Sequence, residues 1–163
     1  MAILISFLES LLTHFEYFSF TQLDAFNYLE SYDPLRYILI AMGLLMIISG
    51  QYLRTLAQMT AGRNFHHQVR YRKEAKHTLV TEGVYQISRH PSYLGWYLWA
   101  VGTQVMMINV ASTVFFIITS WFFFNHRIQI EEELLIDFFG ADYVRYCDKV
   151  PTRLPFIKGY VLE

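Results

Sequence analysis

Long apolar stretches without charge dominate the pattern of polar and apolar positions along this chain. Residues 37–53 contain no charged side chain over seventeen positions, and residues 94–125 contain none over thirty-two. A helix of seventeen residues is about 25 Å long, close to the hydrocarbon thickness of a thin bilayer. Uncharged runs of this length are typical of membrane-spanning helices. The pattern therefore predicts helices that cross a bilayer.

The second stretch is too long for one span and about right for two short ones. Asn109 lies near its midpoint, so we expect a tight helical hairpin over about 94–125 that turns around residues 108–112. The hairpin would return the chain to the side of the membrane from which it entered.

The first twenty residues are apolar but are interrupted by Glu9, His14 and Glu16. Charges are costly in hydrocarbon unless they face protein, so this segment fits either a span packed in a bundle or an amphipathic helix at the interface. Taken as a span, it completes the predicted fold class, an all-α integral membrane protein. That fold is a multi-span helical bundle forming a single domain over residues 1–163, with spans at 1–20, 37–56, 94–108 and 112–125.

Composition agrees with a membrane setting and narrows the function classes. Hydrophobic residues make up 54% of the chain and charged residues 17%, below the roughly 25% usual for soluble domains. The formal net charge of −1 gives no basis for a nucleic-acid partner. Cys147 is the one cysteine, which excludes an internal disulfide framework.

Basic residues gather in two polar segments, 60–93 and 126–158. Arg36 is the one Lys or Arg that lies outside residues 54–89 and the region after 125. The positive-inside rule therefore puts both segments on the cytosolic side. Since the hairpin connects them, we expect them to meet and to form the catalytic part of the chain.

The segment 126–158 has a helical apolar period that ends near Gly140, a residue that commonly terminates helices. We expect a cytosolic C-terminal helix here that completes a pocket. Arg127 and Glu131 are four apart and share one face of it. They fit a surface ion pair, or a functional cation at the membrane boundary, where a charged side chain tends to have a partner or a task.

The segment 60–93 ends in RHPSY. Pro91 can begin a helix, so Arg89 and His90 would lie just before an N-terminus whose unpaired N–H groups favour an anionic or electron-rich ligand. Tyr85 and Tyr93 offer aromatic faces for a flat base or a cation. The alternative is an ordinary interface belt of Arg, Tyr and Trp.

Two other chemistries have no support in the sequence. The histidines of this segment, His66, His67, His77 and His90, show no spacing typical of a zinc site, so no metal is expected. A Ser-His-Asp hydrolase would need a G-x-S-x-G elbow, which does not occur.

Three motifs closely resemble those of the isoprenylcysteine carboxyl methyltransferases, integral membrane enzymes of the endoplasmic reticulum. They are HTLVTEGVYQISRHPSYLGWYLW, RIQIEEELLIDFFGADY and VPTRLPFIKG, and the resemblance extends over roughly residues 57–160. RHPxYxG alone is shared with phospholipid methyltransferases and, with asparagine after the proline, with membrane sterol reductases. Its combination with a hairpin and a following R-x-x-x-E-E is specific.

The resemblance implies S-adenosyl-L-methionine as methyl donor and a C-terminal prenylcysteine carboxylate of CaaX-processed proteins as acceptor, giving the methyl ester. It implies prenylated protein C-termini and membrane lipid as partners, with neither nucleic acid nor metal. It also implies a multi-pass protein of the endoplasmic reticulum membrane whose catalytic face is turned to the cytosol.

Position by position, the resemblance assigns Arg127 as the catalytic and substrate-binding residue. Arg70, where relatives usually carry glutamine, belongs to the set assigned to the cofactor. That set comprises Arg70, His77, Thr78, Leu79, Val80, Tyr85, His90, Pro91, Ser92, Tyr93 and Glu131.

Three alternatives stay open at the level of sequence. A phospholipid or small-amine N-methyltransferase would need a base for an ammonium group and would have less use for Arg127. A membrane sterol reductase would carry asparagine in place of Ser92 and would use a nicotinamide cofactor. A non-catalytic membrane scaffold would bind neither cofactor.

Overall fold

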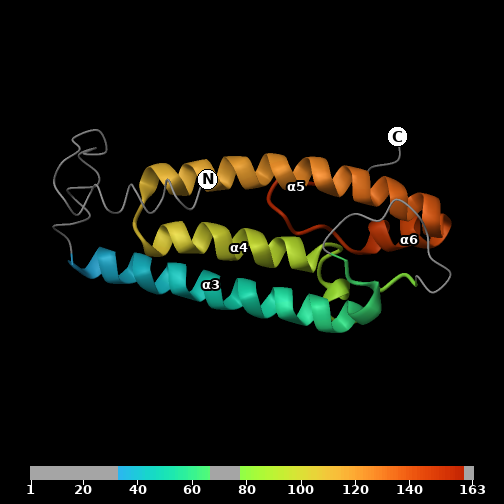
Figure 1. The fold of residues 1–163 in the computed structure, drawn as a ribbon, viewed down its shortest axis with the longest axis horizontal. Helices are drawn as coiled ribbons and strands as arrows, with labels where there is room; N and C mark the ends of the chain where they lie inside the picture. Colours follow the sequence, from blue (N-terminus) through green and yellow to red (C-terminus); the bar gives the residue numbers. More distant parts are fainter. Residues whose placement is uncertain (1–32, 67–77, 160–163) are drawn as a thin grey trace. The chain divides into compact units, whose positions relative to one another are not determined.

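A computed structural model describes residues 33–66 and 78–159, and in that part of the chain all regular structure is helical. Figure 1 traces these helices from α3 in blue to α6 in red. They are α3 (Asp33–Ala61), the short 3₁₀ helices η1 (Gly62–Asn64) and η2 (Gly83–Gln86), α4 (Pro91–Met106), α5 (Val110–Phe139) and α6 (Ala141–Lys149). The predicted all-α class is confirmed for the described residues. The predicted span at 1–20 lies outside them.

The described residues fall into two compact units. The first contains residues 33–49 and 97–119, and the second contains residues 50–66, 78–96 and 120–159. The division falls inside α3, α4 and α5, so each unit is built from parts of the same helices.

Helix α3 contains the predicted span 37–56 and extends beyond it at both ends. The stretch Pro34–Asn64 is the one part of the described chain that is long and apolar enough, by length and composition, to cross a membrane. Many of its apolar side chains are exposed, including Ile38, Leu45 and Tyr52. Outward-facing apolar side chains are what a helix surrounded by lipid requires. The crossings at 94–108 and 112–125 stay predictions.

The predicted helical hairpin is present, but it turns earlier than expected, at residues 107–109. Helix α4 begins at Pro91, as its fixed φ angle favours, and ends at Met106. Ile108 then adopts a positive φ of 57°, which stops the helix. The carbonyl of Asn109 accepts hydrogen bonds from both the N–H and the hydroxyl of Thr113, and α5 follows.

The C-terminal helix expected over 126–140 is present as helix, but it is not separate from the second helix of the hairpin. Helix α5 continues without a break through Arg127 and Glu131 to Phe139. The composition changes from apolar to charged near Asn125, but no proline or glycine lies inside the helix to interrupt its hydrogen bonds. Gly140, with φ 57°, ends it where the sequence predicted. The part of α5 that carries Arg127 and Glu131 is therefore a continuation of the second helix of the hairpin.

Glycines allow the backbones of α3 and α4 to touch. In the first unit, a Cβ at Gly43 would lie 2.4 Å from the backbone nitrogen of Met106. In the second unit, a Cβ at Gly95 would lie 2.5 Å from the carbonyl oxygen of Gly50. Small residues at such contacts are a recurrent means of packing helices in membranes, where close approach replaces the hydrophobic driving force.

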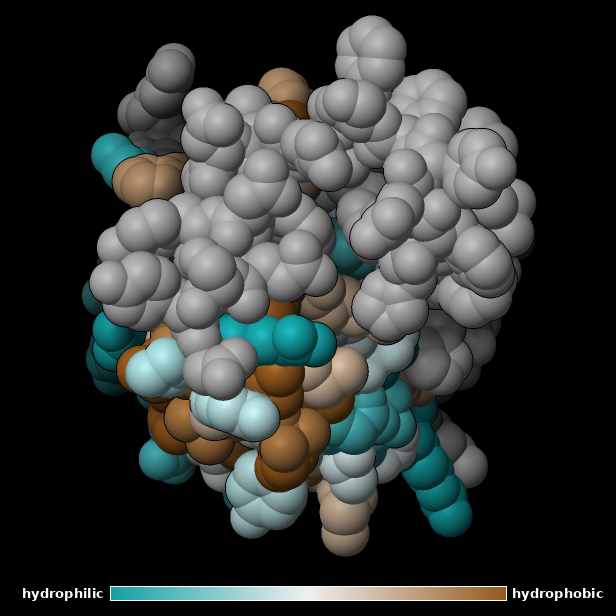
Figure 2. Space-filling view, turned by 90° about the vertical axis from the view of Figure 1, so that its left-hand side faces the viewer, coloured by the Kyte–Doolittle hydropathy of each residue, from teal (hydrophilic) through white to brown (hydrophobic). Residues whose placement is uncertain are grey.

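The end of the first unit that carries the α4–α5 turn has a mixed surface. On the face drawn in Figure 2, apolar side chains gather beside polar ones. Met107, Val110, Val114 and Phe115 are among the large apolar residues exposed at and after the turn. Asn109, by contrast, is buried. The turn thus keeps its polar residue inside and its apolar residues outside, the reverse of a turn in water.

Candidate functional site

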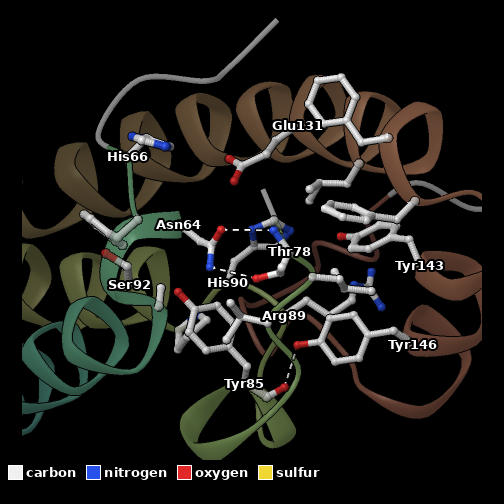
Figure 3. A pocket seen from close by; sticks show the side chains of 18 of the residues that line it. Asn64, His66, Thr78, Tyr85, Arg89, His90, Ser92, Glu131, Tyr143 and Tyr146 are labelled. Carbon is white, nitrogen blue, oxygen red and sulfur yellow. Dashed lines mark hydrogen bonds between the residues drawn. The ribbon is translucent and has the colours of Figure 1, made fainter. Parts of the chain in front are cut away.

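A pocket lies within the second unit, where the chain's polar side chains gather (Figure 3). It is bounded by the end of α3 and the residues after it, the segment around η2, the start of α4, the second half of α5 and the start of α6. Its lining consists of Ala61, Asn64, Phe65, His66, Thr78, Leu79, Val80, Tyr85, Arg89, His90, Pro91, Ser92, Tyr93, Glu131, Leu134, Leu135, Phe138, Phe139, Tyr143 and Tyr146.

The pocket brings together nine of the eleven residues assigned to the cofactor by sequence. These are Thr78, Leu79, Val80, Tyr85, His90, Pro91, Ser92, Tyr93 and Glu131. The other two, Arg70 and His77, lie outside the described residues. The structure places the nine side by side, and their binding of a cofactor stays a prediction.

Hydrogen bonds hold the pocket's separate segments together. The side-chain oxygen of Asn64 accepts from the Thr78 N–H at 3.1 Å, and its amide nitrogen donates to the Thr78 hydroxyl at 3.0 Å. On the opposite wall the Tyr146 hydroxyl donates to the carbonyl of Tyr85 at 2.5 Å. Burial, with a smaller contribution from the charge of Glu131, raises the pKa of Tyr85 to about 12, so this phenol stays neutral at physiological pH.

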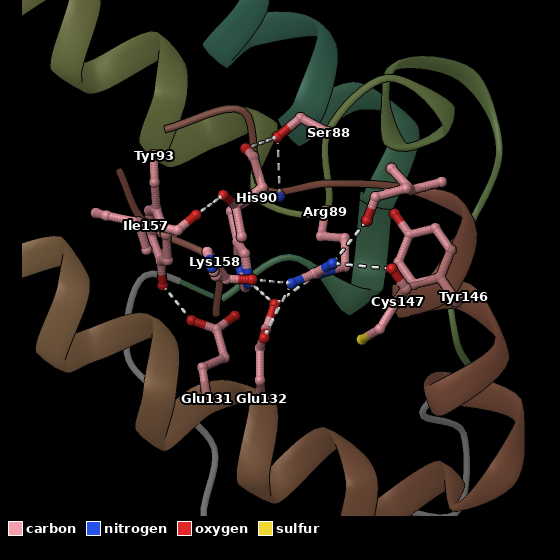
Figure 4. Close-up of polar contacts among 12 residues, drawn as sticks. Ser88, Arg89, His90, Tyr93, Glu131, Glu132, Tyr146, Cys147, Ile157 and Lys158 are labelled. Atoms are coloured by element: carbon pink, nitrogen blue, oxygen red, sulfur yellow. Dashed lines mark hydrogen bonds and ion pairs between the residues drawn. The ribbon is translucent and has the colours of Figure 1, made fainter. Parts of the chain in front are cut away.

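A buried ion pair that the sequence analysis missed lies behind the pocket (Figure 4). Glu132 has no exposed side-chain surface and binds Arg89 through both carboxylate oxygens, with distances of 2.7 Å to Nε and 3.2 Å to Nη2. The same carboxylate lies 2.8 Å from Nε2 of His90. Burial by itself would raise the pKa of Glu132, but hydrogen bonds and charge from His90 and Arg89 outweigh burial and lower it to about 2.

Arg89 is fully satisfied by these contacts and by the chain that follows α6. Its two Nη1 hydrogens have acceptors in the carbonyls of Val150 at 2.7 Å and Cys147 at 3.1 Å, while Nη2 also donates to the carbonyl of Lys158 at 2.8 Å. With the two bonds to Glu132, each of its five N–H donors finds an acceptor. Arg89 therefore fastens the C-terminal segment to the start of α4 and has no donor left for a ligand.

Gly159 closes over this ion pair and has no room for a side chain. It adopts a φ of 80°, and an added Cβ would lie 2.2 Å from Oε2 of Glu132 and 2.5 Å from Nη2 of Arg89. Both facts require glycine at this position.

A second polar cluster joins Arg127 to the pocket. Nε of Arg127 donates to the Tyr93 hydroxyl at 2.8 Å, and that hydroxyl donates in turn to the carboxylate of Glu131. The guanidinium carbon lies 5.3 Å from the centre of the Tyr93 ring and 5.9 Å from that of Phe123. The ring of His90 stacks on the Tyr93 ring, with 5.4 Å between the two ring centres. Arg127 itself does not line the pocket but is connected to it through one hydroxyl.

The run of glutamates indicated that one carboxylate faces the protein interior, but it did not indicate which one. Three glutamates follow one another at 131–133, and successive residues on a helix point about 100° apart. Only one of the three can face the protein interior fully, and Arg89 needs such a partner because it is buried. Glu132 is buried, whereas Glu133 is exposed.

The described residues offer no group of three or more His, Cys, Asp or Glu side chains that could hold a metal ion. What the pocket does offer is one carboxylate, several aromatic faces and apolar walls from α5. A ligand that combines a flat ring with positive charge suits that set.

Comparison with known proteins identifies relatives of this chain. The isoprenylcysteine carboxyl methyltransferase (ICMT) family matches residues 41–137. Proteins named protein-S-isoprenylcysteine O-methyltransferase share 47% identity over 142 residues in Saccharomyces cerevisiae, covering 87% of this chain and 58% of that protein. The Homo sapiens protein of the same name is 52% identical over 121 residues, covering 74% of this chain and 43% of that protein.

A solved structure is similar over nearly the whole chain. The structure described as the eukaryotic intramembrane Ras methyltransferase ICMT matches with a TM-score of 0.84 and 40% sequence identity. It covers 98% of this chain and 53% of that chain. The present chain therefore spans about half the length of the relatives it matches.

Proposed function

Since the chain belongs to the isoprenylcysteine carboxyl methyltransferase family, we propose that it methylates the C-terminal α-carboxylate of prenylcysteine with S-adenosyl-L-methionine as donor. The observation that carries the proposal is that the Tyr93 hydroxyl connects the pocket to Arg127. Tyr93 lines the pocket and bridges Glu131 to Arg127. This contact supports a proposed cofactor site and a proposed carboxylate-binding cation that lie next to each other.

The pocket fits the donor by the chemistry of its lining. When bound, S-adenosylmethionine supplies an electrophilic methyl group on a positively charged sulfur. Glu131 and the faces of Tyr85 and Tyr93 favour positive charge, and the α5 side of the pocket, with Leu135 and Phe139, suits a flat base. His77 and Arg70 complete the proposed set from outside the described residues.

Arg127 is the proposed acceptor-binding and catalytic residue. A carboxylate is ionised at pH 7, so its methylation needs no general base. It needs alignment with the donor and removal of water from both reactants. A guanidinium can hold a carboxylate through charge-assisted hydrogen bonds. The contact of Arg127 with Tyr93 restricts where that guanidinium can lie, which supports alignment.

Aromatic side chains beside Arg127 suit the lipid half of the acceptor. The centre of the Phe124 ring lies 5.1 Å from that of Tyr93 and 5.4 Å from that of Trp96. Phe123 lies next to the guanidinium, and more than half of its surface is exposed. Burial of a prenyl chain is favourable by about 0.8 kcal/mol per CH₂. The proposed enzyme is a multi-pass protein of the endoplasmic reticulum membrane, with residues 60–93 and 126–158 facing the cytosol.

A methyl-transfer assay tests this function. The full chain, reconstituted in liposomes, should transfer label from methyl-labelled S-adenosylmethionine to N-acetyl-farnesylcysteine and release it as a base-labile ester. Unprenylated N-acetylcysteine is the matched control and should remain unlabelled. Labelling of phosphatidylethanolamine in place of the prenylcysteine would assign the chain to phospholipid N-methylation.

A further inference from the structure

One buried hydroxyl in the pocket wall lacks a hydrogen-bond partner. Tyr143 is 1% exposed, and its hydroxyl is the buried side-chain polar atom of the described residues that makes no hydrogen bond. Figure 3 shows Tyr143 among the side chains that line the pocket, with its oxygen at the end of the ring nearer to the other labelled residues. An unpaired buried hydroxyl lowers stability, so its presence calls for an explanation.

The neighbouring Tyr146 shows that a tyrosine hydroxyl on this part of α6 can find a hydrogen-bond acceptor. Tyr146 lies one turn along α6, its ring is 5.9 Å from that of Tyr143, and its hydroxyl donates to the Tyr85 carbonyl at 2.5 Å. The Cys147 thiol makes a weak side-chain hydrogen-bonding contact with Tyr143. Because sulfur is a weak donor and acceptor, this contact leaves the hydroxyl without a hydrogen bond of normal geometry.

The surroundings define what kind of ligand atom can meet this hydroxyl. Burial and then the charge of Glu132 raise the pKa of Tyr143, so the phenol remains protonated and can donate. Tyr143 belongs to a buried cluster with Tyr146 and Val150, and the side chains packed against that cluster include Leu79, Leu135 and Phe139, all of which also line the pocket. Such walls suit a flat, neutral ring with an acceptor at its edge. The carboxylate of Glu131 marks a more polar part of the lining.

We propose that the Tyr143 hydroxyl is a cofactor-binding contact that donates a hydrogen bond to the nucleoside half of the methyl donor. This inference rests on the proposed function for the identity of the cofactor. The adenine ring has acceptor nitrogens at its edge, and the apolar walls around Tyr143 cover its faces. The ligand thereby supplies a partner for the Tyr143 hydroxyl, so part of the cofactor's affinity comes from relieving the cost of an unpaired buried group.

The test compares Tyr143→Phe with the matched control Tyr146→Phe in the purified full chain. Without ligand, Tyr143→Phe should unfold at the same or a higher temperature than the wild type, because it removes an unsatisfied group. Tyr146→Phe should unfold at a lower temperature, because it removes a paired donor. Calorimetric titration with S-adenosylhomocysteine should give a Kd roughly tenfold weaker for Tyr143→Phe.

A second ligand locates the contact. 5′-Methylthioadenosine keeps the nucleoside and lacks the amino acid, so Tyr143→Phe should weaken its binding by the same factor. Unchanged binding of both ligands by Tyr143→Phe overturns the inference and leaves the proposed function standing. The inference is also wrong if methylthioadenosine binding alone is unchanged, or if Tyr143→Phe lowers the unfolding temperature. Failure of the wild type to bind S-adenosylhomocysteine overturns both the inference and the proposed cofactor.

Discussion

Two polar clusters share the second unit and differ in what surrounds them. In the Arg89 cluster, all five guanidinium donors reach protein acceptors, and the partner carboxylate of Glu132 is wholly buried. In the Arg127 cluster, one hydroxyl connects the guanidinium to Glu131, and the cluster borders a pocket. Neighbouring glutamates on one helix can therefore have different roles: Glu132 stabilises the fold, and Glu131 belongs to a candidate reaction site.

The largest expected effect comes from breaking the structural cluster. Glu132→Gln should destabilise the protein by about 3–5 kcal/mol, because it leaves the buried charge of Arg89 without its counter-ion. Thermal unfolding of the purified chain measures the effect. Glu133→Gln, at the adjacent exposed position, is the matched control and should change stability little. Equal stability of the two variants would contradict the structural role of the Arg89 cluster.

Breaking the other cluster should affect the reaction and not the fold. Arg127→Ala should lower kcat/KM for farnesylcysteine, and the decrease should correspond to a loss of about 2–4 kcal/mol of transition-state stabilisation. The affinity for S-adenosylhomocysteine should stay within about threefold of the wild type. The assay combines methyl-transfer kinetics with calorimetric binding. A parallel loss of cofactor affinity would move Arg127 from the acceptor to the cofactor.

Acid should weaken the structural cluster within a defined pH range. The pKa of Glu132 is about 2 in the folded protein against an ordinary 4.5, so the folded state binds fewer protons. Its contribution to stability is complete above about pH 4.5 and is lost as pH falls toward 2, at about 1.4 kcal/mol per pH unit. Denaturant unfolding between pH 6 and 3 measures it. A stability that stays constant down to pH 3 would contradict the depressed pKa.

The smallest predicted effect concerns the hydroxyl that connects the reaction cluster. Tyr93→Phe should keep the ring and its stacking but leave Nε of Arg127 without this acceptor, lowering kcat/KM for the prenylcysteine roughly five- to tenfold. Tyr37→Phe, an exposed position on α3, serves as the control. If Tyr93→Phe behaves like Tyr37→Phe, the hydroxyl does not position Arg127.

Local features of the fold were predictable because they depend on short stretches of sequence. The start of α4 at Pro91 and the end of α5 at Gly140 follow from residues with restricted or unusual backbone angles. The apolar helix follows from the lack of charge over residues 37–53. The helix after residue 125 was predicted, but its continuity with the hairpin was not, because a change from apolar to charged residues marks a change of solvent and does not break a helix.

Helical segments, the concentration of polar residues and the family motifs can all be read from the sequence. What each charged side chain contacts depends on how the helices pack. Glu131 and Glu132 are the same residue type one position apart, and no local pattern separates them. Their roles diverge because the helix turns by 100° per residue, which directs one carboxylate to the pocket and the other to Arg89 and His90, forty-odd residues away in the chain.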